Sequence, residues 1–250
     1  MTTSTRATRI LGVLAAGGLA LTAVLALVVS PADVNQQDAV RLLYIHVPTA
    51  WLALYLSFGV TTLCSALYLW PRTRSRFWDL AAGASAEIGV LFLGLTLVIG
   101  SIWGRTTWGV WWTWDARLTT TAVLFVLYLG YLALRRVPDD IDARSKRCAI
   151  AALAAFVGVP IVHLSVEWWR TLHQPASILD ERRLLDPAIH GSMAWTLLVG
   201  VIAFTLVYAW LLIHRFRVAW LEEKLEDRVL ETALAERRAE ASAALVAGPR

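Results

Sequence analysis

The residues that bear most directly on chemistry are five tryptophans that fall within twelve positions: Trp103, Trp108, Trp111, Trp112 and Trp114. Gly104 and Gly109 interleave them and permit tight backbone turns. Indole rings are large, rigid and apolar, so they suit a flat hydrophobic ligand that stacks or lies edge-on. A membrane-surface aromatic belt is the simpler explanation, but a belt accounts for only one or two tryptophans at each helix end. The cluster predicts a platform for a flat apolar ligand.

Two histidines have the chemistry to hold a metal ion beneath such a platform. His46 lies five residues after Arg41, and His163 lies four residues before Glu167. If these charges mark helix ends, each imidazole lies about 6 to 7 Å inside its helix. Neutral imidazole is a common axial ligand of haem iron, although a lone histidine at a helix end is more often a packing residue. We predict that His46 and His163 are the two axial ligands.

Further polar residues accompany these histidines. Asp115 and Arg117 follow the tryptophans and either pair with each other or leave Arg117 to bind a ligand carboxylate. Glu167 lies four residues after His163, which places it on the same helical face, where it would accept the second ring N–H and orient the imidazole. Trp168 extends the predicted aromatic surface, and His173 is a weaker third candidate ligand.

The composition indicates the elements that must position these residues. The chain has 250 residues, of which 58% are hydrophobic and 17% charged, whereas soluble domains average about 45–50% and about 25%. Six stretches lack charge, apart from Glu87 in the third, and each is long enough to cross a bilayer as a helix. They lie between Arg9 and Asp33, between Arg41 and Arg72 and between Asp79 and Arg105, and over residues 118–134, 148–166 and 187–214. We predict an all-α integral membrane protein with six spans.

The positive charges predict the orientation of these spans. Twelve Lys and Arg residues lie at the N-terminus, in the second and fourth connections and at the start of the tail, against six in the other connections. Both termini are therefore predicted to be cytoplasmic. Segments 31–41, 103–117 and 167–186 then face outward, with the tryptophan-rich loop between the third and fourth helices. The apolar N-terminal run is too long for a typical signal peptide, so we interpret it as an uncleaved first span.

Other sequence features define the domains and limit the possible functions. We divide the chain into a six-helix domain, residues 1–214, and a cytoplasmic helical tail, residues 215–250. The apolar stripe of this tail touches a partner subunit, lies along the membrane or is simply solvated. Glu87 lies inside a span, either on a proton or ion pathway or as a buried carboxyl in helix packing. Cys64 and Cys148 form neither C-x-x-C nor C-x-x-C-H, so haem attached covalently through that motif is excluded. No phosphate-binding loop is present, so the chain is not itself an ATPase.

Three stretches resemble a known family. Residues 108–119 read W-G-x-W-W-x-W-D-A-R-L-T and are similar to the tryptophan-rich (WWD) signature of haem-handling proteins of cytochrome c maturation. The stretches Y-I-H-V-P at 44–48 and H-L-S-V-E-W-W at 163–169, followed by L-H-Q at 172–174, resemble the CcmC branch in particular. The similarity covers residues 10 to 214.

The resemblance implies a function and partners. Proteins of this family present haem at the outer membrane face to the haem chaperone CcmE, in an assembly with CcmB, CcmD and the ATPase CcmA. It also implies that the family's two axial histidines match His46 and His163, and that its tryptophan-rich loop matches residues 103–119.

We therefore expect a multi-pass protein of the cytoplasmic (inner) membrane, in contact with lipid and with no nucleic acid. It would bind haem b transiently and non-covalently at the outer face and transfer it, without being an enzyme. A quinone-linked bis-His haem oxidoreductase is an alternative. A secondary transporter that uses Glu87 is a further one, although no repeats are visible.

Overall fold

The computed structural model describes residues 3–174 and 189–247, and these residues form helices joined by short connections. Six helical stretches are long and apolar enough to cross a membrane: Arg6–Val29, Asp38–Leu69, Arg76–Trp108, Ala116–Leu134, Ile141–Trp168 and Gly191–Glu240. Within the described ranges there is no β-strand. The prediction of an all-helical protein with six candidate spans is confirmed.

The first three spans differ in regularity. α1 (Arg6–Val24) continues as a π-helical turn, η1 (Leu25–Val29). The second span is assembled from η2 (Asp38–Leu42), α2 (Leu43–Trp51), the π-helical η3 (Leu52–Ser57) and α3 (Phe58–Leu69). α4 (Arg76–Trp108) is one unbroken helix of 33 residues that begins at the N-cap Ser75.

The last three spans are α5 (Ala116–Leu134), the pair α6 (Ile141–Phe156) and α7 (Gly158–Trp168), and α8 (Gly191–Ala247). The fifth span breaks at Val157 because Pro160 has no N–H for the carbonyl four residues earlier, at Phe156. α8 continues through residues 214 and 215 without interruption. The predicted tail is thus, over its described residues, the continuation of the last span.

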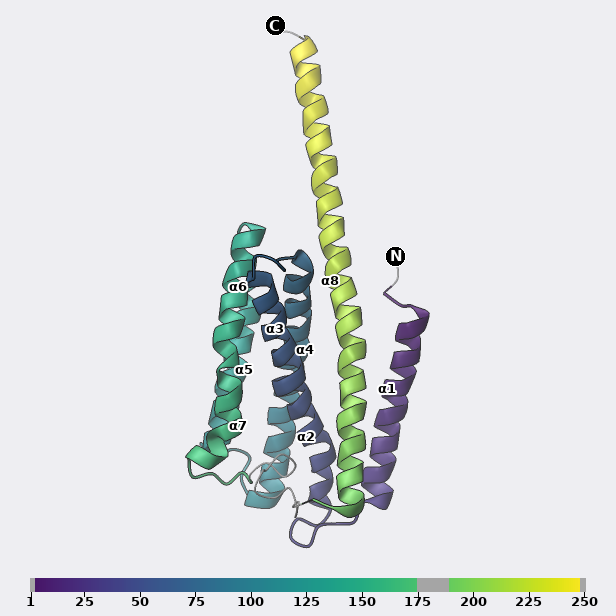
Figure 1. Ribbon diagram of the computed structural model, residues 1–250, viewed down its shortest axis with the longest axis vertical. Helices are drawn as coiled ribbons and strands as arrows, with labels where there is room; N and C mark the ends of the chain where they lie inside the picture. Colours follow the sequence, from purple (N-terminus) through teal and green to yellow (C-terminus); the bar gives the residue numbers. More distant parts are fainter. Residues whose placement is uncertain (1–2, 175–188, 248–250) are drawn as a thin grey trace.

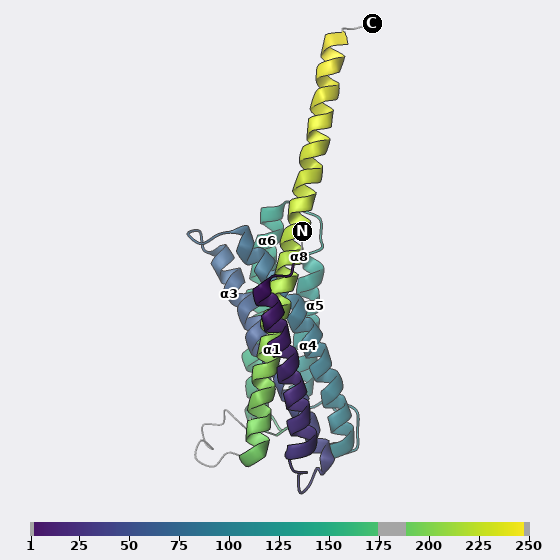
Figure 2. The ribbon, with the colours of Figure 1, turned by 90° about the vertical axis from the view of Figure 1, so that its right-hand side faces the viewer.

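Both chain ends leave the bundle on the same side (Figure 1). We call this side the termini end, and the opposite side, where α4 stops at Trp108 and α5 starts at Ala116, the tryptophan end. α8 extends beyond the bundle at the termini end (Figure 1). α1 packs along α8 in both views (Figures 1 and 2), so the first apolar helix belongs to the bundle.

The core lies between α3, α4, α5 and α6. Phe58 on α3 stacks on Tyr128 on α5, with ring centroids 3.5 Å apart and planes within 6°. α4 presents a buried run of small residues that lets its neighbours approach closely. A Cβ at Gly89 would lie only 2.5 Å from the Phe58 ring, so glycine there permits the contact between α3 and α4.

Charged residues near the termini end are paired. Asp79 is 3% exposed and accepts from the Arg135 guanidinium at 2.8 Å, and it also pairs with Arg76. Glu87 accepts two hydrogen bonds from Arg215 on α8, one at 2.8 Å. The sequence showed no evident basic partner for Glu87. The structure gives it one, which favours its role in helix packing over an ion pathway.

Candidate functional site

The tryptophan-rich segment is shorter as a loop than the sequence suggested. We expected a loop over residues 103–117, but α4 continues to Trp108 and α5 starts at Ala116, which leaves a connection of residues 109–115. Gly109 ends α4 with a positive φ of 79°, and its carbonyl accepts from the Arg105 guanidinium. Trp103 and Trp108 are therefore held rigidly on a helix.

The indoles of the connection face outward. Trp111, Trp112 and Trp114 are 59%, 36% and 85% exposed, and Trp112 and Trp114 contact each other edge to face at 5.9 Å. Trp168 and Trp169 at the end of α7 are also about half exposed. An open groove of about 470 Å³ lies between Trp114, the start of α5 and Trp169. The tryptophan end thus presents several apolar faces that a flat molecule could cover.

His46 lies at the centre of a contact between three segments. Its ring meets the ring of Trp103 edge to face at 5.6 Å and lies 6.5 Å from the ring of His173, at an interplanar angle of 38°. A Cβ at Gly100 would lie 2.9 Å from the His46 ring, so the glycine makes room for the imidazole. The Trp103 Nε1 donates to Gln36 at 2.8 Å, which ties the connection after α1 to the same place.

His163 is in a different environment. Its Nδ1 is hydrogen-bonded to the hydroxyl of Tyr55 at 2.5 Å. Tyr55 follows His46 by nine residues in the same span, on the order of 10 Å along a helix. The expectation that His46 and His163 lie at the same depth stays a prediction. His173, the weaker candidate from sequence, is the histidine that the fold brings to His46.

Asp115 positions the segment that carries His173. Its carboxylate caps α5 by accepting from the Arg117 backbone N–H at 2.9 Å, and it accepts from the Leu172 N–H at 2.6 Å. Burial raises the pKa of Asp115, but hydrogen bonds from Thr171 and from the backbone outweigh it, so the pKa is lowered overall. The carboxylate thus remains ionised and joins α5 to the chain after α7.

Asp115 bonds to the backbone N–H of Arg117, and the Arg117 side chain makes its hydrogen bond elsewhere. Its guanidinium donates to the backbone carbonyl of His163 at 2.7 Å. Its buried Nε has no hydrogen-bond partner within residues 3–174 and 189–247. An arginine N–H suits a carboxylate, so the alternative in which Arg117 binds a ligand carboxylate stays a prediction. The orienting role predicted for Glu167 stays a prediction.

The two imidazoles fit a metal ion as its ligands. The Nδ1 of His173 donates to the Gln174 carbonyl at 2.8 Å, which leaves the Nε2 lone pair available. Burial and, to a smaller extent, the nearby charge of Arg117 lower the pKa of His173 to about 4, so the ring is neutral at pH 7. The Nδ1 of His46 is buried without a hydrogen-bond partner among the described residues. A nitrogen–metal bond is about 2 Å long, which makes a ring separation of 6.5 Å compatible with one shared ion.

Fold and site together define a class of protein, an all-helical membrane protein with a pair of imidazoles beside Trp103 and several exposed tryptophans in its loops. The chain belongs to the CcmC family, heme exporter protein C, whose family model matches residues 1–231. It is 41% identical over 196 residues to heme exporter protein C of Haemophilus influenzae, covering 78% of this chain and 76% of that protein. The same-named protein of Bradyrhizobium diazoefficiens is 39% identical over 199 residues, covering 79% and 73%. That of Escherichia coli is 37% identical over 208 residues, covering 82% and 80%.

Sequence reasoning missed part of this site. Tyr55, Gln36 and Gly100 gave no signal because their roles depend on contacts with distant segments. His173 was visible only as a third histidine near Trp168 and Trp169. Its pairing with His46 joins residues 127 positions apart.

Proposed function

We propose that the chain binds haem at the tryptophan end of the bundle and delivers it to an acceptor during cytochrome c maturation. Membership of the heme exporter protein C family supports the role in haem delivery. The observation that best supports a haem site here is the pair of imidazoles of His46 and His173. Their ring centroids are 6.5 Å apart, and the His46 ring contacts Trp103.

Haem is here the cargo, held non-covalently and transiently as haem b. His46 and His173 would supply the two axial nitrogens, and filling both positions discourages oxygen chemistry on the iron. Trp103 packs against the edge of His46 and fixes its ring, while the hydrogen bond to Gln174 fixes the tautomer of His173. The exposed indoles would cover the macrocycle, and Arg117 would meet a propionate.

The proposal also includes the orientation of the chain in the membrane and its partner proteins. The tryptophan end faces the periplasm, and the termini end faces the cytoplasm, in the inner membrane. The haem acceptor is a CcmE-type chaperone, and the chain works as a non-enzymatic subunit with CcmA, CcmB and CcmD. The abundance of exposed indole around the histidines supports release to a partner, because an acceptor can reach the ligand without passing through the core.

Single histidine variants test the ligand pair. We expect His46→Ala and His173→Ala to lose most of the haem absorption of the detergent-purified protein. His163→Ala is expected to keep it, because that ring is held by Tyr55. His190→Ala, at an exposed position, is the matched control. Loss of haem in His163→Ala but not in His173→Ala would restore His163 as the second ligand, and full haem content in His46→Ala would refute the site.

Handover is tested separately by co-purification with a CcmE-type acceptor, with and without haem. We expect a complex that forms only when haem is present and that the His46→Ala chain does not form. A stable, stoichiometric haem protein that exchanges electrons with quinol and ignores the acceptor would instead favour the oxidoreductase alternative.

A further inference from the structure

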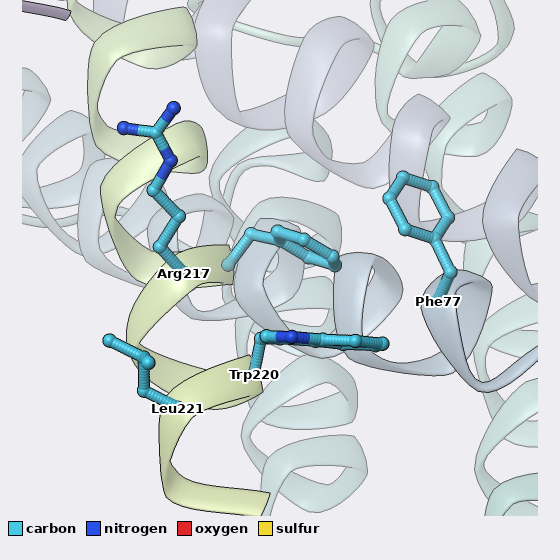
Figure 3. A pocket seen from close by; sticks show the side chains of 5 residues that line it. Phe77, Arg217, Trp220 and Leu221 are labelled. Carbon is cyan, nitrogen blue, oxygen red and sulfur yellow. The ribbon is translucent and has the colours of Figure 1, made fainter. Parts of the chain in front are cut away.

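A second candidate binding feature lies at the termini end, remote from His46 and His173 in the fold. It is a small crevice of about 260 Å³ lined by Phe77 of α4 and by four residues of α8: Phe216, Arg217, Trp220 and Leu221. Figure 3 shows the Trp220 ring reaching from α8 toward Phe77. The proposed haem site uses none of these residues.

The walls of the crevice are aromatic and open to the outside. The rings of Phe77 and Phe216 lie 4.8 Å apart, and Phe216 stacks on Trp220 with centroids 6.3 Å apart. Phe77 remains 43% exposed and Trp220 37% exposed, so the rings form a lined hollow and do not close over one another. Such a surface favours a slender apolar chain.

Two basic side chains flank the same hollow. Arg217 and Lys224 are seven residues apart on α8, so they lie on one face of the helix, about 10 Å apart along its axis. The Lys224 ammonium stands 5.2 Å from the Trp220 ring centroid, and Arg217 is held in place by donating to the Thr3 carbonyl at 2.5 Å. After these contacts, both side chains still have N–H groups that can bind an anion.

Two acidic residues close to this face already have basic partners. Glu223 pairs with Arg76, and Glu222 lies 3.6 Å from Arg215. Neither carboxylate is therefore needed to neutralise Arg217 or Lys224. Arg217 and Lys224 therefore provide the positive charge beside the crevice, which is complementary to a phosphate.

The position and size of the crevice identify the kind of ligand. Charged residues resume on α8 at Arg215, after its apolar run, which places the crevice at a membrane–water boundary. Its volume is below the about 300–1,000 Å³ of drug-sized sites, and a helix about 10 Å across would not enter it. Basic pockets between membrane helices at such a boundary bind anionic lipid headgroups. We propose that the crevice binds one acyl chain of an anionic glycerophospholipid, with the lipid phosphate between Arg217 and Lys224.

The test measures lipid binding to the full-length protein in detergent by native mass spectrometry. Phosphatidylglycerol and phosphatidylcholine of equal chain length are titrated, and we expect bound phosphatidylglycerol in preference. The double variant R217Q/K224Q is expected to weaken phosphatidylglycerol binding about 30-fold, since each basic residue near a phosphate contributes about five-fold. R228Q/R237Q removes the same charge from the exposed continuation of α8 and is expected to change nothing.

Two further measurements separate lipid binding from loss of folding and from binding of phosphate alone. Lys224→Gln alone leaves the contact between Arg217 and Thr3 intact, so it separates lost binding from lost folding, and an about five-fold loss is expected. Inorganic phosphate at the same concentration should not displace the lipid, because it has no chain for the aromatic crevice. Equal binding of both lipids, equal loss in the R228Q/R237Q control, or displacement by phosphate would each overturn the proposal.

Discussion

At the scale of the residue, the site depends on polar atoms whose second partners lie far along the chain. Asp115 shows this most clearly, because one oxygen caps α5 and the other holds the Leu172 N–H next to His173. A local sequence pattern predicts the cap, since aspartate is favoured at that position. It contains no information on Leu172.

We predict that Asp115→Asn lowers the stability of the purified protein by about 1–2 kcal/mol at pH 7, because an amide cannot accept both backbone hydrogen bonds equally well. The pKa of Asp115 is lowered in the fold. Its contribution is therefore fully present above the unfolded pKa of about 3.9 and is lost as pH falls through the lower folded value. Thermal melts from pH 8 to pH 3 should show a constant gap between wild type and variant down to about pH 5, closing below about pH 4. A gap that closes between pH 7 and pH 5 would show that the fold raises the pKa of Asp115, which would contradict the lowered pKa.

At the scale of the element, the positions of the helices are set by small residues and by prolines. α4 carries Trp103 at one end and the paired Asp79 at the other in one rigid rod. Its contact with α3 depends on Gly89, whose missing Cβ admits the Phe58 ring. The break at Val157 similarly separates α6 from α7, which carries His163.

We predict that Gly89→Ala destabilises the bundle by about 1–3 kcal/mol, because the added methyl would overlap Phe58 and Ser57. Gly59→Ala on α3 is the matched control, since a Cβ there meets nothing within 4 Å. The control should be neutral or slightly stabilising through its helix propensity. Thermal unfolding in detergent would check both, and equal melting temperatures would contradict the packing argument.

At the scale of the whole molecule, the two ends do different work. The tryptophan end gathers exposed indoles and the imidazoles of His46 and His173. The termini end holds buried charges that join four helices: Asp79 and Arg76 of α4 contact Arg135 after α5, Ser145 of α6 and Glu223 of α8. The bundle and the continuation of α8 are thereby connected through ion pairs.

We predict that Asp79→Asn destabilises the protein by about 3–5 kcal/mol, because it leaves Arg135 largely buried without its counter-charge. Asp139→Asn, which removes the partner of Arg147 in a more exposed pair, should cost no more than about 1 kcal/mol. Thermal melts measure the stability, and haem content per folded molecule should be unchanged because the two ends are remote. Similar losses in both variants would mean that the network is not a structural centre.

The sequence by itself determined the six spans, because the transfer of contiguous residues into hydrocarbon depends on local composition alone. It also determined the cluster of indoles and identified His46 as a candidate metal ligand. Residue type and spacing along one helix or connection are local properties that a sequence shows directly. Only the tertiary structure decided that His46 meets His173 while His163 bonds to Tyr55, and that Glu87 pairs with Arg215. These pairings depend on which helix faces pack together and how far each chain reaches beyond its helix, and such long-range geometry leaves no periodic signal in a single sequence.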